Sequence, residues 1–112
     1  MEKRYTSKVG KELTERLYKA GMPLKVNVNY DLNKYTNMIE RKLDIEPPSY
    51  AKLFDWLADK GAWLIVERHP SSGKYCPVHM DEVIWFDTFQ KAADEYVNRL
   101  LNRWEENEAK KD

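Results

Sequence analysis

The chain has 112 residues, and 19 Lys and Arg balance 19 Asp and Glu, so its formal net charge is zero. This length fits a single domain over residues 1–112 with one core, and the balanced charge argues against a dedicated binder of duplex nucleic acid. A single cysteine excludes an internal disulfide, and no apolar run approaches membrane-spanning length. We therefore expect a cytoplasmic protein without a signal peptide or a membrane partner.

The first 45 residues predict a helix followed by a β-hairpin. A polar segment, residues 1–6, is expected to be frayed, and a helix over 8–20 then places its apolar residues on one face and ends before Gly21. From Leu24 to Leu32 apolar and polar residues alternate, as in a half-buried strand. After a turn at 31–34 the alternation resumes. Residues 36–45 could also begin as a helix over 36–43, and the sequence leaves these two readings open.

The middle of the chain predicts a second helix and a second hairpin. Pro47-Pro48 interrupts any ladder, and Ser49 caps a helix that ends at Gly61. The run Ala62 to Val66 is apolar at every position, which is typical of a strand covered on both faces. A turn at 70–73 then leads to a partner strand over 75–80, in which Pro77 indicates an edge.

The last element predicted is a long amphipathic helix over 88–104, capped by Asp87 or Thr88. Its apolar positions recur at the spacing of one helix face, and we expect the preceding strands to cover them. Residues 105–112 lose this pattern and are predicted to form a frayed tail. The predicted order is α-β-β-α-β-β-α, an α+β fold with three helices and a small antiparallel sheet of about four strands.

Two segments resemble a group of small uncharacterised proteins encoded by gut Bacteroidetes and their phages and mobile elements. One is the helix start Pro48-Ser49-Tyr50-Ala51-Lys52, which is similar to a "PTYAE"-like motif. The other is Phe86-Asp87-Thr88-Phe89-Gln90-Lys91-Ala92, which is similar to a "YDTYEEA"-like cap and helix. This chain has Ser for Thr and Lys for Glu in the first motif, and Phe, Gln and Lys in the second. Because the motifs are caps and core positions, the resemblance implies a fold but no activity.

The only residues of metal-ligand type that cluster in the sequence are His69, Cys76, His79 and Asp81. Zinc accepts this donor set, and a thiolate beside an imidazole would be a nucleophilic pair. In a regular strand, however, Cys76 and His79 point to opposite faces unless Pro77 makes a bulge, so whether they share a face stays open. A buried Cys76 acting as a small apolar residue is the favoured reading. Glycine-rich phosphate loops are absent, and no cofactor is predicted.

Three function hypotheses remain. The favoured one is a non-enzymatic interaction or regulatory accessory module whose partner is another protein or a second copy, because aromatic residues are abundant and catalytic motifs are absent. The docking surface is predicted to include Trp56, Tyr75 and Tyr18, near the strand edge at 75–80. The second hypothesis is a nucleic-acid-associated factor of a mobile element, since the first 20 residues hold six basic and three acidic residues. The third is a small Cys/His metal protein or enzyme.

Overall fold

A computed structural model describes residues 3–78, 80 and 82–109 of the chain. The α+β class and the order α-β-β-α-β-β-α are confirmed, if the one-turn helix α1 is counted with α2. The strands form two separate antiparallel pairs, β1–β2 and β3–β4, rather than one sheet. The elements are α1 (Lys3–Thr6), α2 (Lys11–Lys19), β1 (Val26–Asn33), β2 (Met38–Ile45), α3 (Tyr50–Asp59), β3 (Val66–Arg68), β4 (Tyr75–Pro77) and α4 (Phe89–Ala109).

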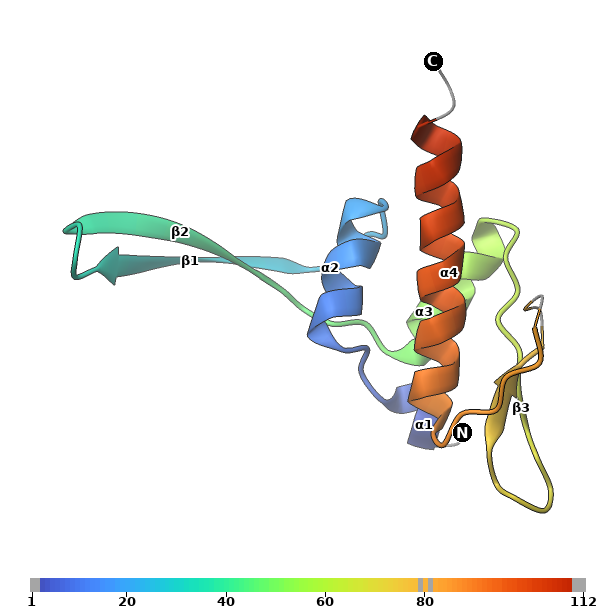
Figure 1. Cartoon of the computed structure of the whole chain (residues 1–112). Helices are drawn as coiled ribbons and strands as arrows, with labels where there is room; N and C mark the ends of the chain where they lie inside the picture. Colours follow the sequence, from blue (N-terminus) through green and yellow to red (C-terminus); the bar gives the residue numbers. More distant parts are fainter. Residues whose placement is uncertain (1–2, 79, 81, 110–112) are drawn as a thin grey trace.

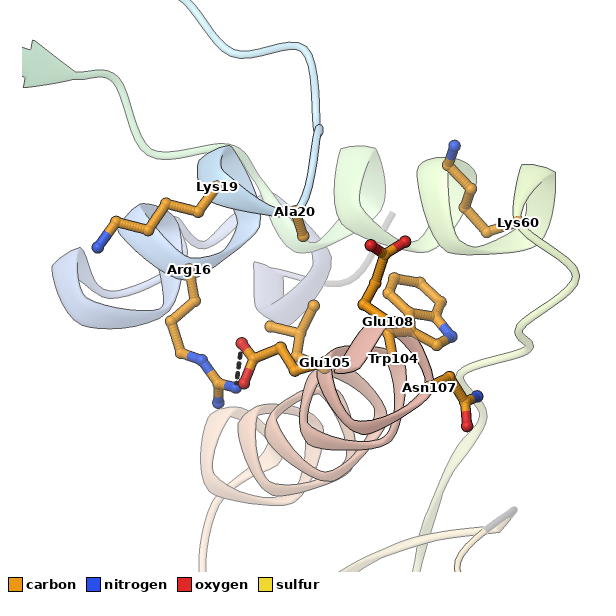
Figure 2. Close-up of a pocket in the computed structure, with 9 residues that line it drawn as sticks. Arg16, Lys19, Ala20, Lys60, Trp104, Glu105, Asn107 and Glu108 are labelled. Carbon is orange, nitrogen blue, oxygen red and sulfur yellow. Dashed lines mark hydrogen bonds and ion pairs between the residues drawn. The ribbon is translucent and has the colours of Figure 1, made fainter. Parts of the chain in front are cut away.

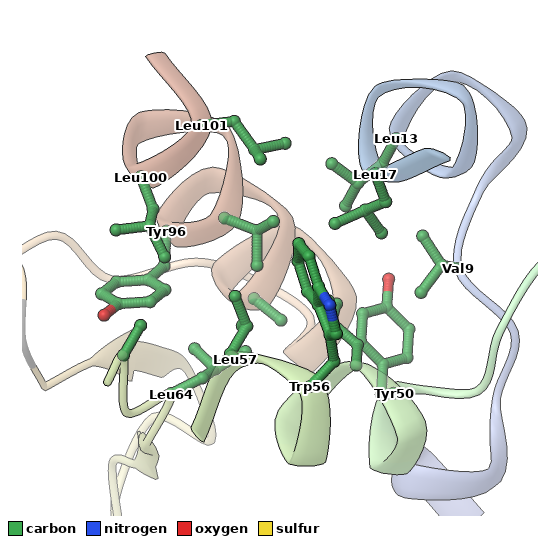
Figure 3. Close-up of a cluster of buried hydrophobic side chains, with 14 of the residues drawn as sticks. Val9, Leu13, Leu17, Tyr50, Trp56, Leu57, Leu64, Tyr96, Leu100 and Leu101 are labelled. Atoms are coloured by element: carbon green, nitrogen blue, oxygen red, sulfur yellow. The ribbon is translucent and has the colours of Figure 1, made fainter. Parts of the chain in front are cut away.

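The core lies between α2, α3 and α4, and α4 contributes the largest share of it (Figure 3). The helix face predicted from the spacing of apolar residues is the buried face of α4, where Ala93 and Val97 are completely inaccessible. Helices α2 and α3 cover this face with Leu17, Leu53 and Leu57, all equally inaccessible. Strands β3 and β4 also contact α4, so the expectation that the strands cover this helix is confirmed for the second hairpin and wrong for the first. The three helices bury their apolar faces against one another.

The N-terminal segment differs from the prediction of a frayed start and one helix over 8–20. Residues 3–6 form α1, and the ring of Tyr5 packs edge-to-face on Phe54 and Phe89, both at 5.3 Å between centroids. Gly10 then occupies the N-cap of α2 without a side-chain bond, so this helix begins three residues later than predicted. The chain between the two helices is extended and bonds to the start of α3, with the Val9 N–H donating to the Pro48 carbonyl at 2.9 Å. A partly buried aromatic anchor therefore fixes a segment that its polarity alone suggested would be frayed.

The predicted caps of α3 and α4 are confirmed. The Lys52 N–H donates to Ser49 Oγ at 3.2 Å, and the Lys91 N–H donates to Thr88 Oγ1 at 3.1 Å. Gly61 follows α3 with φ of 79°, a left-handed conformation that favours glycine. Helix α4 continues through residues 105–109, so the predicted tail is wrong for them, and 110–112 lie outside the described residues. Glu105 pairs with Arg16 of α2 at 3.1 Å, which fixes the start of this last part of the helix.

The strands of the second hairpin are shorter than predicted. In the run 62–66 only Val66 is in a strand, and the expectation of a run covered on both faces is wrong. Ala62 and Leu64 face the core, whereas Trp63 and Ile65 are exposed, so the run alternates although every residue in it is apolar. The turn at 70–73 is confirmed, with Gly73 at φ of 72°. The partner strand ends at Pro77.

The first hairpin, β1–β2, extends away from the helical body (Figure 1). It settles the open alternative in favour of strands, because residues 38–45 pair with 26–33 along their whole length around a turn at 34–37, three residues later than predicted. The radius of gyration is 17.1 Å, whereas a compact domain of this length has about 13 Å. The prediction that the first strand is half-buried on the core is wrong, since only residues near the ends of the hairpin are partly covered.

Candidate interaction surface

The β1–β2 hairpin carries one face that is almost entirely apolar. Antiparallel pairing places directly opposed residues on the same side of the ladder, and every second residue along a strand shares that side. The observed register therefore puts four cross-strand pairs on one side: Val26 with Ile45, Val28 with Leu43, Tyr30 with Arg41, and Leu32 with Ile39. We call these eight residues the apolar face. Arg41 is its one charged member.

Val26 and Ile45 at the base of the apolar face are partly buried, but nothing in the described part of the chain covers the rest of it. Tyr30, Leu32 and Ile39 are 68%, 59% and 71% exposed, and Val28 and Leu43 are also exposed. Each is a large side chain in contact with water over much of its surface, which costs free energy roughly in proportion to the apolar area left wet. Isolated two-stranded hairpins are marginal in water, so this one gains stability if a second surface covers its apolar face.

The opposite face of the same hairpin is polar, with Met38 its only apolar residue. Lys42 Nζ lies 2.9 Å from Asp31 Oδ2, and this hydrogen bond raises the pKa of Lys42 above its usual value. Nearer the turn, the Asn33 side-chain amide donates to Glu40 Oε1 at 2.8 Å. The two faces therefore differ sharply in chemistry, although both are exposed. This amphipathic pattern is typical of a strand pair with one face covered.

The turn of the hairpin presents an aromatic ring to solvent. The Asn33 side-chain oxygen accepts from the Tyr35 N–H at 3.0 Å, and the Asn37 N–H donates to the Asn33 carbonyl at 2.8 Å. Asn37 has φ of 55°, a left-handed conformation that asparagine tolerates better than most residues. These bonds order the turn, while the side chain of Tyr35 is 100% exposed. Tyr35 therefore stands on an ordered tip with no contact to its own body.

A depression of about 300 Å³ lies at the other end of the hairpin, where β2 meets α2. Leu43 and Ile45 of the apolar face contribute to its lining. Its charged lining residues are Lys11 and Glu15 of α2 and Asp44 of β2, one basic and two acidic. We call this depression the root pocket. It is continuous with the apolar face because the two share residues.

A second, wider groove of about 970 Å³ lies between the ends of α2, α3 and α4 (Figure 2). Its basic residues, Arg16, Lys19 and Lys60, are mixed with Glu105 and Glu108, so it does not form a basic site for phosphate. The Arg16 guanidinium is occupied by α4, where it donates to Asn98 Oδ1 at 2.7 Å, Asn102 Oδ1 at 2.8 Å and Glu105 Oε1 at 3.1 Å. The most central cation of the predicted basic helix therefore serves the helix packing.

The three residues predicted to bind a partner do not form one surface. Trp56 is only 9% exposed and packs edge-to-face on Trp104, with ring centroids 5.9 Å apart, so little of its side chain is left to contact a partner. The side chain of Tyr75 is half-buried. Its backbone N–H donates to the Phe86 carbonyl at 2.8 Å, and its carbonyl accepts from the Phe86 N–H at 2.7 Å. Phe86 therefore occupies the strand edge at Tyr75, which was predicted to bind a partner. Tyr18 is exposed on α2.

The cluster predicted to hold a metal is not assembled among the residues that the structure describes. His79 and Asp81 lie outside those residues, and no group of three or more His, Cys, Asp or Glu within the described ranges could hold a metal ion. Cys76 is buried, in agreement with the favoured reading of it as a small apolar residue. His69 Nδ1 accepts the N–H groups of Ser71 and Ser72, both at 3.1 Å, and its ring packs on Trp85. His69 therefore orders the turn of the second hairpin.

One ionisable pair is partly buried away from these surfaces. The Tyr50 hydroxyl donates to Asp94 Oδ1 at 2.6 Å, between α3 and α4. Burial raises the pKa of Asp94, although the hydrogen bond from Tyr50 acts in the opposite direction. Burial and the bond to Asp94 together raise the pKa of Tyr50 above its usual value. The pair joins two helices, and no pocket described above includes it, so we assign it a structural role.

Comparisons with known proteins return nothing: no family model, curated protein or solved structure matches this chain. Within the described residues, every helix is too short or too polar to cross a lipid bilayer. The structure itself is therefore the basis for a functional proposal.

The sequence reasoning missed the apolar face, although the signal for it was present. The alternation from Leu24 to Leu32 and the residues Ile39, Leu43 and Ile45 were recognised as strand features. Alternation shows which residues share a side of a strand, but it does not show what covers that side. The prediction assumed that the core covers it, whereas the helices and the second hairpin complete the core, and no residue of β1 or β2 belongs to it.

Proposed function

We propose that this chain is a non-enzymatic interaction module, and that the apolar face of the β1–β2 hairpin is the surface that binds another protein chain. The observation that supports this most directly is the exposure of the apolar face beside a complete helical core. Five large exposed side chains of about 100 Å² each amount to roughly 500 Å², which is at the upper end of the apolar patches that soluble monomers show and is typical of an interaction site.

The polar features of the hairpin support the same proposal. The ion pair on the opposite face and the bonded turn favour the ordered hairpin before a partner binds. An ordered surface loses less conformational entropy when a partner binds it than a disordered one does. A role as an accessory or regulatory protein of the cytoplasm, where cysteines such as Cys76 stay reduced, is consistent with these properties.

The proposal is tested by affinity capture from the cells that make this protein, with three tagged forms of the full chain. Wild type is compared with Tyr30→Asp, which places a charge on the apolar face, and with Asn29→Asp, which places the same charge on the polar face one residue earlier. We expect bound chains to be recovered with wild type and with Asn29→Asp and to be lost with Tyr30→Asp. Equal recovery with all three forms would contradict the proposal. Amide signals of the turn residues 34–37 in an NMR spectrum show that each variant keeps its hairpin.

A further inference from the structure

We propose that the chain that covers the apolar face is a second copy of this protein: two β1–β2 hairpins pack face to face and antiparallel, and Tyr35 of each enters the root pocket of the other. This inference rests on the proposed function and specifies its partner. It follows from three properties of the hairpin: the order of its cross-strand pairs, the positions of Tyr35 and the root pocket, and the charges around both.

The order of the four cross-strand pairs is self-complementary under a two-fold axis through the middle of the face. Such an axis places the pair Val28–Leu43 of one copy over the pair Tyr30–Arg41 of the other, so small side chains meet large ones. The outer pairs, Val26–Ile45 and Leu32–Ile39, also meet, and all four of their side chains are aliphatic. The stem of Arg41 can lie on the apolar surface while its guanidinium reaches water at the rim. An antiparallel arrangement also sends the two helical bodies to opposite ends.

The same arrangement brings the tip of each hairpin to the base of the other. Tyr35 projects beyond the last pair of the apolar face, and the root pocket lies at the opposite end of the face, where Leu43, Ile45 and α2 line it. Strands of eight residues span about 26 Å, so the tip and the root pocket are one hairpin length apart. A volume of about 300 Å³ accommodates one aromatic side chain. Each copy thus offers both a protruding ring and a depression that can receive it.

The charges at the two ends are opposite in sign. Lys34 is the only charged residue of the turn 34–37. The root pocket has one basic and two acidic lining residues, Lys11 against Glu15 and Asp44, so its net charge is −1. When Tyr35 enters the pocket of the second copy, Lys34 comes close to this acidic surplus. The charge pattern therefore favours tip-on-root contact over tip-on-tip contact, which would bring two lysines together.

The buried area is sufficient for a specific dimer of moderate affinity. Two apolar faces of roughly 500 Å² each, with Tyr35 seated at both ends, bury about 1,200 Å² in total. Specific interfaces begin near this area. Because association also costs translational and side-chain entropy, an interface of this size corresponds to a dimer that forms and separates at micromolar concentrations. The monomer keeps its own helical core in either state.

Sedimentation of the full chain over a wide concentration series tests the inference first. We expect the mass to rise with concentration from 13.4 kDa towards twice that value. Asn29→Asp should behave as wild type. Tyr30→Asp should need at least about tenfold higher concentration to associate, because it removes the large ring from the face and its carboxylate must lose water on burial, even opposite Arg41. A wild type that stays monomeric at all concentrations, or a Tyr30→Asp variant that associates as well as wild type, would overturn the inference.

Disulfide trapping then tests the tip-on-root geometry. Tyr35→Cys and Glu15→Cys are prepared separately and mixed under oxidising conditions, with wild type as the control for the buried Cys76. We expect covalent dimers in the mixture and far fewer in either variant alone, because the two tips lie at opposite ends of the dimer. Dimers that form best from Tyr35→Cys alone would overturn the antiparallel arrangement. If wild type is monomeric but Tyr30→Asp still loses a captured foreign protein, this inference fails while the proposed function stands.

Discussion

Replacing Trp56 by alanine should remove a large part of the stability of the fold. Its indole is 9% exposed and lies among the core side chains (Figure 3). It packs edge-to-face on Trp104 of α4, with 5.9 Å between the ring centroids. Truncating a buried Trp to Ala typically costs about 3–5 kcal/mol through lost burial and the cavity left behind. A domain of this size has a free energy of unfolding of about 5–15 kcal/mol, so Trp56→Ala should lower the melting temperature by more than about 10 °C.

The matched control is Trp63→Ala, which removes the same side chain seven residues later from a position that is 63% exposed. We expect it to cost less than about 1 kcal/mol. Urea unfolding should be followed by far-UV circular dichroism, because both substitutions change the tryptophan fluorescence. If Trp56→Ala costs no more than Trp63→Ala, then Trp56 is not part of the core, and its earlier interpretation as a docking residue would regain support.

Three further predictions concern α4. Leu100→Asp buries an unpaired charge, so it should leave no cooperative unfolding transition when unfolding is followed by circular dichroism. Lys91→Asp, on the exposed side of α4, should keep the transition. A folded Leu100→Asp protein would contradict the assignment of the buried face. Thr88→Ala should cost about 1 kcal/mol in urea unfolding by removing the N-cap bond, and Thr88→Ser should restore it; equal stability of all three forms would contradict the cap. Burial raises the pKa of Asp94 above 3.8, so the folded state holds this proton more tightly than the unfolded state, and the resulting stability is present below pH 3.8 and lost as the pH rises through the folded-state pKa. Asp94→Asn keeps an acceptor for Tyr50, and it should reduce this decline in the free energy of unfolding between about pH 3 and 7. An unchanged dependence on pH would contradict the assignment of the decline to Asp94.

Local signals in the sequence predicted the elements well, because the physics of helix caps and of alternation is local. Ser49 and Thr88 are caps because their short side chains reach backbone N–H groups three residues later, which any sequence context allows. The face of α4 followed from spacing alone. Gly61 ends α3 because it can adopt the left-handed conformation.

Tertiary placement could not be predicted in the same way. Tyr5 looked like part of a frayed end because its neighbours are polar, yet its contacts with Phe54 and Phe89 join residues far apart in the chain. The strand edge at Tyr75 looked free because the pairing of Phe86 with it leaves no pattern in sequence. Likewise, the apolar face of the β1–β2 hairpin and the core face of α4 have equally regular spacing, and only the fold shows that one is covered and the other is not.

The position of α4 in the chain has a consequence during synthesis. Helix α4 covers apolar side chains of α2 and α3, yet it is made after both of them. Until residues 89–101 have been added, Leu17 and Leu57 lack the surface that buries them, and at typical synthesis rates this interval lasts seconds. The β1–β2 hairpin needs only a four-residue turn and can close within microseconds. A nascent chain therefore displays an ordered hairpin long before its core exists, and its early apolar surfaces are a natural target for chaperones.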